Sequence, residues 1–164
     1  MPLRYPPPLI APGWRYDLVA TPLALAEVIC AAVGEIGVVE DPPGSNAGPV
    51  LRYGGELGEP WCADFLTWCY ARADGGCPWA RASSAWKLET WARAHHRVLP
   101  DSAPLVPGDV ALLVRADFHG HAGLVVADLG GDYIATIEGN VHGAVRALVH
   151  PRSTFPVYLR PLAA

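Results

Sequence analysis

The sequence predicts an α+β fold in which N-terminal helices pack on a mostly antiparallel sheet of about five strands. Two observations support this prediction. Apolar residues recur at helical spacing in the N-terminal half, whereas after Pro107 short apolar runs alternate with glycine and proline. The connections between these later runs are short, and short connections join antiparallel neighbours.

The composition fits one globular domain. The chain has 164 residues, of which 51% are hydrophobic and 17% charged, which is enough apolar material for one buried core. The 17 prolines and 17 glycines favour many turns and short elements. We expect the proline-rich residues 1–20 to form an extended arm and residues 21–164 to form the folded domain.

The first helix is expected to begin at Thr21, a good N-cap, with Pro22 at the first helical position. It runs through LALAEVICAAVGEIG and ends at one of the glycines. Cys30 lies beside its apolar face and is expected to be a small buried side chain. The residues that form the apolar stripe are Leu25, Val28, Ile29, Ala32 and Val33.

Two further helices are expected after a loop. The turn-rich segment EDPPGSNAGP predicts a loop over residues 40–49. A helix then covers residues 60–73, with Pro60 at its start. A third helix runs from Ser83 or Ser84 to about His95. The apolar face of the second helix comprises Cys62, Phe65, Leu66 and Cys69, widened by Trp61 and Trp68.

Five short strands are expected in the C-terminal half. Each is an apolar run bounded by glycine or proline. The runs are DVALLVRA at 109–116, GHAGLVVADLG at 120–130, DYIATIEGN at 132–140, GAVRALVH at 143–150 and FPVYLRPL at 155–162.

The charge pattern argues against nucleic acid as a partner. The formal net charge is −4 and the sequence contains no basic tract of the kind that binds phosphates. A negative net charge also gives no electrostatic attraction to an anionic cell surface.

No membrane or zinc pattern is visible. The four cysteines do not form paired C-x-x-C units. The N-terminus has no continuous apolar segment and no small-residue cleavage site, so no secretory signal is predicted. The most apolar stretch, residues 18–33, contains Pro22 and Glu27 and is too short to span a bilayer. We expect synthesis in the cytoplasm, reduced thiols and no membrane insertion.

Cys62 is the first candidate for chemistry. It lies within the first turn of the second expected helix. Unpaired backbone N–H groups and the helix dipole favour an anion there, so a thiolate nucleophile would be stabilised. An isolated cysteine at a helix start is more often structural, and its position alone does not decide its role.

A base and its orienting groups are expected on two strands. His121 begins the second expected strand between small residues, where it can serve as base for a nearby thiol. Glu138 and Asn140 alternate onto one face near the end of the third strand. A carboxylate or amide there would fix the tautomer of the base. Without such a role, His121 would be a histidine that only packs or lies at the surface, and Glu138 and Asn140 would belong to a solvated strand end.

Read in order along the chain, these segments resemble the CHAP family of cysteine amidohydrolases and endopeptidases, relatives of the NlpC/P60 and papain-like enzymes. The resemblance covers roughly residues 25–149. The matching pieces are GSNAGP at 44–49, PWCADFLTWC at 60–69, PGDVALL at 107–113, GHAGLVV at 120–126 and IEGN at 137–140.

The resemblance implies a papain-like α+β fold and a catalytic domain over residues 21–164. It implies Cys62 as nucleophile, His121 as base, and Glu138 with Asn140 as orienting or assisting groups. The implied substrate is bacterial peptidoglycan, cut at an amide bond either as an N-acetylmuramoyl-L-alanine amidase or as a stem-peptide endopeptidase. No cofactor is expected. The expected substrate contacts are Asn46, Trp61 and Trp86.

Two other functions stay open at this point. His119 and His121, with Glu138 or His142, would suit a zinc hydrolase, although Cys62 would then have no role. The second alternative is an inactive CHAP-like module that only binds the cell wall or a partner. The acidic residues of the N-terminal half form no loop with calcium-ligand spacing.

The absence of a visible secretory signal bears on where such an enzyme would act. We expect it to reach the cell wall or periplasm through phage lysis or specialised secretion, as an endolysin or a secreted effector. A delivery system or a cognate immunity protein is then a further expected partner.

Overall fold

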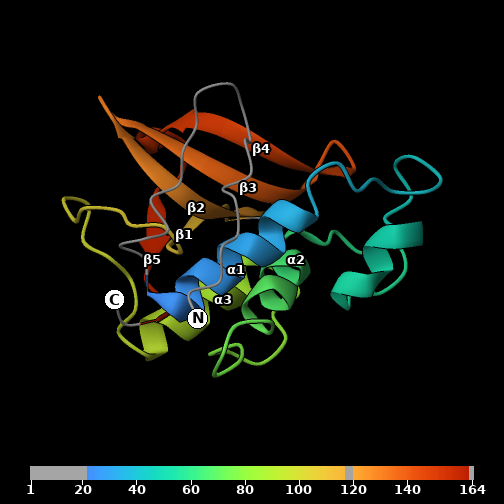
Figure 1. The fold of residues 1–164 in the computed structure, drawn as a ribbon, viewed down its shortest axis with the longest axis horizontal. Coiled ribbons are helices and arrows are strands. Elements are labelled where there is room, and N and C mark those ends of the chain that lie inside the picture. The colour runs from blue at the N-terminus through green and yellow to red at the C-terminus, as the bar shows by residue number, and fades with distance from the viewer. Residues whose placement is uncertain (1–21, 117–119, 163–164) are drawn as a thin grey trace, which may run out of the picture.

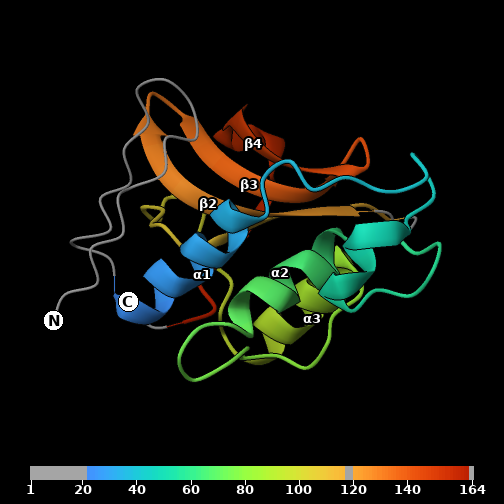
Figure 2. The same ribbon diagram turned by 45° about the vertical axis from the view of Figure 1, so that its right-hand side comes forward.

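The computed structural model describes residues 22–116 and 120–162 of the chain. Three α-helices lie on one face of a single sheet (Figures 1 and 2). This arrangement confirms the predicted α+β class. The expected arm of residues 1–20 and the N-cap Thr21 lie outside the described residues. The helices are α1 (Leu23–Gly34), α2 (Cys62–Tyr70) and α3 (Ala85–Ala94).

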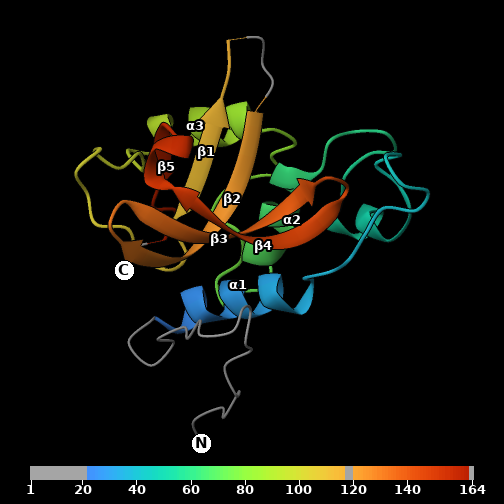
Figure 3. The same ribbon diagram turned by 90° about the horizontal axis from the view of Figure 1, so that it is seen from above.

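The sheet has five strands in the order β4-β3-β2-β1-β5, and every neighbouring pair is antiparallel (Figure 3). All five expected strands are present, with bounds that differ slightly from the expected ones. The glycine and proline signals therefore separated the five strands correctly but did not fix where each strand begins and ends. The strands are β1 (Val110–Val114), β2 (Gly120–Gly130), β3 (Tyr133–Val141), β4 (Ala144–Pro151) and β5 (Val157–Leu159).

The α2 helix is shorter at both ends than the expected range of residues 60–73. Its first residue is Cys62, so the candidate nucleophile stands at the N-terminal end itself. At the other end, Arg72 and Ala73 donate to carbonyls three residues earlier, which tightens the last turn. Gly75 and Gly76, both with positive φ, then turn the chain away.

The α3 helix begins where the sequence predicts. The Ser84 side chain accepts a hydrogen bond from the Lys87 N–H, as an N-cap serine should. The α1 helix starts at Leu23, directly after Pro22, and buries four of the five residues of its predicted stripe. Cys30, which was expected to be buried, is only half-buried because it lies at the flank of that stripe.

Strand alternation places core on both faces of the sheet. Leu112 and Leu124 belong to the main core, which also contains the buried faces of the helices. Their neighbours Ala111 and Val125 belong to a second cluster, which includes Phe155. Buried clusters therefore lie on both faces of the sheet.

The segment from residue 40 to 49 is a loop as predicted, except that a 3₁₀-helix, Gly48–Tyr53, begins before it ends. Gly48 has φ +76°, and a Cβ there would lie 2.6 Å from the Asp41 carbonyl oxygen. Only glycine fits this position, so the loop folds tightly back on itself. Within the described residues, no helix is both long and apolar enough to cross a membrane.

Candidate active site

The candidate nucleophile lies at the N-terminal end of α2. The first backbone hydrogen bond of this helix runs from the Phe65 N–H to the Trp61 carbonyl, at 2.9 Å. No side chain caps the N–H groups that precede it within the described part of the chain. These groups and the helix dipole favour negative charge at this end. The Cys62 side chain, largely buried, therefore lies beside these N–H groups at the helix start.

His121 connects Cys62 to a carboxylate. Its Nε2 lies 2.7 Å from Glu138 Oε2, and its side chain is also hydrogen-bonded to Cys62. Because Nε2 is taken by Glu138, Nδ1 is the ring nitrogen left for the sulfur. Thiol, imidazole and carboxylate thus form one chain of hydrogen bonds from α2 through β2 to β3.

The surroundings of His121 favour its protonated form. Burial lowers the pKa of His121, but the hydrogen bonds to Cys62 and Glu138 outweigh burial and raise it to about 10. The imidazole therefore carries its proton at neutral pH. A protonated imidazole between a sulfur and a carboxylate can donate a hydrogen bond to each of them.

Glu138 is 2% exposed, and both of its oxygens are hydrogen-bonded. Oε2 is bound to His121, while Oε1 accepts from the Thr136 hydroxyl and lies 2.7 Å from His150 Nε2. Burial raises the pKa of Glu138, but the bonds from His121 and Thr136 and the electrostatic effect of the two histidines hold it below its usual range. The carboxylate is therefore ionised despite its burial.

Two glycines leave space for these contacts. Gly123 pairs with Glu138 across β2 and β3, and a Cβ at Gly123 would lie 2.8 Å from Glu138 Cγ. A Cβ at Gly139 would lie 2.7 Å from Phe65 Cβ, so glycine lets β3 approach α2 closely. The small residues beside His121 and Glu138 thus serve the packing of the site.

Asn140 does not follow the predicted alternation. It has φ +60°, at an irregularity in the β3–β4 pairing between Glu138 and Val141. The regular alternation that would place Asn140 on one strand face with Glu138 is therefore interrupted there, and its contact with His121 stays a prediction. The Asn140 side-chain amide lies 3.3 Å from Asn46 Oδ1 and faces the start of α2.

With its oxygen turned toward α2, the Asn140 amide accepts from the Trp61 N–H and donates to Glu40 Oε1, both at 3.2 Å. Glu40 is buried and also accepts from the Trp61 indole N–H at 2.9 Å. Asn140 therefore binds the residue that precedes the nucleophile. Its contacts suit a group that holds the helix start, not one that orients the base.

Comparison with known families decides the relationship. A sequence profile described as CHAP domain matches residues 53–140, which is more than half of the chain. The chain belongs to the CHAP domain family. CHAP domains are generally hydrolases that act on peptidoglycan, as amidases or peptidases. No curated protein matches the chain.

The CHAP match spans Cys62, His121, Glu138 and Asn140, and in the structure His121 is hydrogen-bonded to both Cys62 and Glu138. Asn46, an expected substrate contact, donates to the Gly58 carbonyl and lies beside Asn140. It is half-buried at the edge of the same group of residues.

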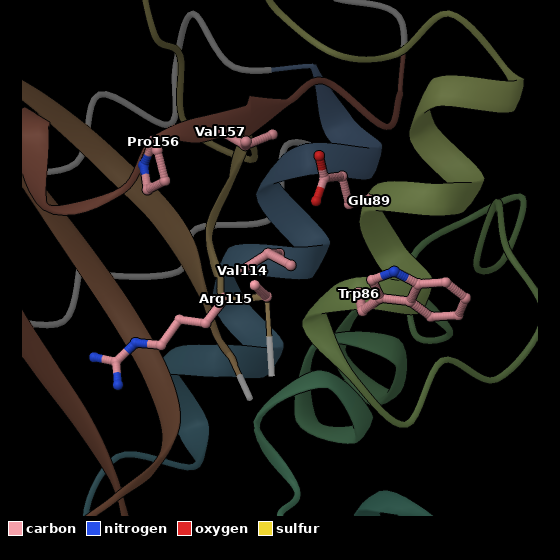
Figure 4. A pocket seen from close by; sticks show the side chains of 7 residues that line it. Trp86, Glu89, Val114, Arg115, Pro156 and Val157 are labelled. Atoms are coloured by element: carbon pink, nitrogen blue, oxygen red, sulfur yellow. The ribbon is translucent and has the colours of Figure 1, made fainter. Parts of the chain in front are cut away.

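The other two expected substrate contacts differ in exposure. Trp61 is 1% exposed and stacks on Tyr53, so it is a core residue and we do not propose it as a substrate contact. Trp86 is 45% exposed and lies on the wall of a surface pocket of about 500 Å³ (Figure 4). The pocket is also lined by Glu89, Val114, Arg115, Ala116, Pro156 and Val157.

The zinc alternative involves His119, whose position the structure does not describe. His121 Nε2 is occupied by Glu138. Within residues 22–116 and 120–162, no three His, Cys, Asp or Glu side chains come together as metal ligands. All four cysteines are free, and all lie in the described part of the chain.

Three polar residues of the CHAP site were missed by the sequence analysis. Thr136 lies two residues before Glu138 on the same strand, so period-2 alternation signals its position. His150 lies on the next strand, and only the strand register brings it to Glu138. Glu40 comes from the loop before the 3₁₀-helix Gly48–Tyr53, and no sequence pattern points to its contact with Trp61.

Proposed function

We propose that this chain is a cysteine hydrolase that cleaves an amide bond of bacterial peptidoglycan. The observation that carries the proposal is the chain of hydrogen bonds from Cys62 through His121 to the buried Glu138. A thiol at a helix start, paired with an oriented imidazole, is what nucleophilic attack on an amide requires. The CHAP match supports the choice of substrate.

In the proposed mechanism, the Cys62 thiolate attacks the amide carbonyl carbon and forms a tetrahedral intermediate. The backbone N–H groups at the start of α2, including that of Cys62, stabilise the negative oxygen. His121 then gives its proton from Nδ1 to the amine nitrogen, the C–N bond breaks, and the amine leaves while the acyl group stays on Cys62 as a thioester. A water molecule, activated by the neutral imidazole, attacks the thioester and releases the free acid and the thiol.

Glu138 and Asn140 have different parts in this mechanism. Glu138 holds His121 Nε2, so the ring keeps Nδ1 toward Cys62 and its positive charge is stabilised. Asn140 holds the Trp61 N–H and so positions the helix end that carries the proposed oxyanion donors.

Substrate contacts are proposed on the surface near these groups. A Cβ at Gly120 would lie 3.0 Å from Ala85 Cβ, which places the start of α3 beside the residue that precedes His121. Trp86 follows Ala85 and lines the pocket of Figure 4. We propose this pocket and the half-buried Asn46 as contacts for the glycan or peptide on either side of the scissile bond.

The proposed substrate fixes the proposed place of action. Peptidoglycan lies outside the cytoplasmic membrane, so we propose that the chain works in the cell wall or periplasm after lysis or specialised secretion. A delivery system and a cognate immunity protein are the proposed partners. Expression directed to the periplasm of a Gram-negative host should then lyse cells, whereas cytoplasmic expression should not.

The decisive experiment is digestion of purified peptidoglycan followed by mass spectrometry of the soluble products. Release of intact stem peptides with free L-alanine amines would identify an amidase, and shortened peptides an endopeptidase. Activity should survive EDTA and stop after treatment with iodoacetamide. Activity that is lost in chelator and restored by zinc would contradict the cysteine mechanism. Wall binding without cleavage would identify the inactive module instead.

A further inference from the structure

His150 is a second histidine on the carboxylate of the site. Its Nε2 lies 2.7 Å from Glu138 Oε1, the same distance that separates His121 Nε2 from Oε2. Glu138 therefore stands between two imidazoles, one from β2 and one from β4. His150 also lies outside residues 53–140, the part of the chain that matches the CHAP family.

The position of His150 is fixed by its neighbours. It pairs with Ile134 in the β3–β4 ladder, and its ring meets the Phe155 ring edge to face at a centroid distance of 5.3 Å. The side chain is 24% exposed, which leaves its outer edge open to water. The ring is thus held by packing with Nε2 directed at the carboxylate.

The groups that face Glu138 come from three strands. They are His121 from β2, Thr136 from β3 itself and His150 from β4. Arg146 pairs with Glu138 in the β4 register, but its guanidinium donates to the Val141 carbonyl. Cys62 from α2 acts on Glu138 only through His121. On the Oε1 side, His150 is therefore the one titratable donor among the described residues.

We propose that His150 is a positioning residue, which donates its Nε2–H to Oε1 and so keeps Glu138 ionised and aimed at His121. A carboxylate fixed by donors on one oxygen cannot rotate its other oxygen away from the base. A buried carboxylate that loses a donor is also easier to protonate. The inference rests on the proposed cysteine mechanism, because it assigns His150 to the same site.

The test compares His150→Phe, which removes the donor, with His150→Gln, whose amide N–H can replace Nε2–H. His95→Phe is the matched control, because His95 is exposed at the end of α3 and outside the site. Three quantities are measured for each protein: kcat on purified peptidoglycan, the rate of Cys62 alkylation by iodoacetamide from pH 4 to 9, and the thermal midpoint over the same pH range.

His150→Phe should lower kcat on the order of tenfold with little change in KM. The acid-side midpoint of Cys62 alkylation should move up by roughly one pH unit, because Glu138 then takes a proton at higher pH. His150→Gln should restore most of the rate, and His95→Phe should match the wild type.

Two results would overturn the inference. One is that His150→Phe lowers the thermal midpoint equally at every pH and leaves the alkylation profile in place, as a purely structural residue would. The other is that His150→Gln is as impaired as His150→Phe. Alkylation does not require peptidoglycan, so a shifted profile in a protein that cuts no peptidoglycan would retain the role of His150 and reject only the proposed substrate.

Discussion

At the scale of single residues, two cysteines on one helix have opposite surroundings. Cys62 is the first residue of α2 and is hydrogen-bonded to His121. Cys69 lies near the other end of the helix, fully buried in the main core. Burial raises the pKa of the Cys69 thiol well above its usual value, so that thiol stays neutral. Only one of the two is placed to act as a nucleophile.

We therefore expect Cys62→Ser to abolish hydrolysis while the thermal midpoint stays the same or rises, since active sites often store strain. Cys69→Ser, the matched variant in the same helix, should cost about 1–3 kcal/mol of unfolding free energy through a buried hydroxyl and keep its rate per folded molecule. Wall lysis and thermal melting measure both. Robust lysis by Cys62→Ser would end the cysteine-hydrolase proposal.

The carboxylate that holds the base should control the alkaline limit of activity. The bond to Glu138 is one of the causes that raise the His121 pKa to about 10, and His121 must be protonated to serve the leaving amine. Glu138→Gln should lower kcat on the order of 10²–10⁴-fold and move the alkaline limb of the rate profile to lower pH. A pH–rate profile with an unmoved alkaline limb in this variant would contradict the assignment of Glu138.

At the scale of elements, the site depends on how closely β2 and β3 approach. Glu138 lies over the position that a side chain at Gly123 would fill. An alanine Cβ there would lie 2.8 Å from Glu138 Cγ and 3.2 Å from its Cδ, so the carboxylate must shift away. The β2 strand therefore supplies the base and also the space for its partner.

Gly123→Ala should accordingly lower kcat by roughly ten- to a hundredfold, because a displacement of about 1 Å is costly at a reacting centre. Gly34→Ala is the matched control, since a Cβ at Gly34 meets no atom within 4 Å. It should leave the rate unchanged. Steady-state kinetics on solubilised peptidoglycan measures both, and a fully active, folded Gly123→Ala protein would refute the packing argument.

The elements could be predicted from sequence wherever a local rule decides them. Glycine and proline marked the five strands, and Ser84 marked the start of α3. Local rules failed at Asn140, where a positive φ interrupts the alternation that would have placed it beside Glu138. They also did not reveal His150, because its contact depends on the β3–β4 register and not on spacing along the chain.

At the scale of the whole molecule, the site joins parts of the chain that are far apart in sequence. The 40–49 loop, α2, β2, β3 and β4 each contribute a polar side chain to it. Folding therefore brings the ionisable groups of the site together. As a result, the pKa values of His121 and Glu138 differ between the folded and the unfolded chain. Folding stability and the charge state of the site are linked through these differences.

The sign of this linkage gives the last prediction. His121 has a folded pKa of about 10 against 6.5 when unfolded, so its contribution to stability is complete below pH 6.5 and disappears as the pH rises through 10. The folded pKa of Glu138 is lowered from 4.5, so its contribution is present above pH 4.5 and is lost as the pH falls through the folded value. The site should therefore stabilise the fold most between pH 4.5 and 6.5.

Denaturant unfolding of the wild type and of His121→Gln, measured from pH 3 to pH 11, tests this linkage. The difference in unfolding free energy between the two proteins should be largest between pH 4.5 and 6.5 and shrink on both sides. His95→Gln, at an exposed histidine outside the site, controls for loss of an imidazole. A difference that stays constant across this range would mean that His121 and Glu138 do not form a charged pair in the folded protein.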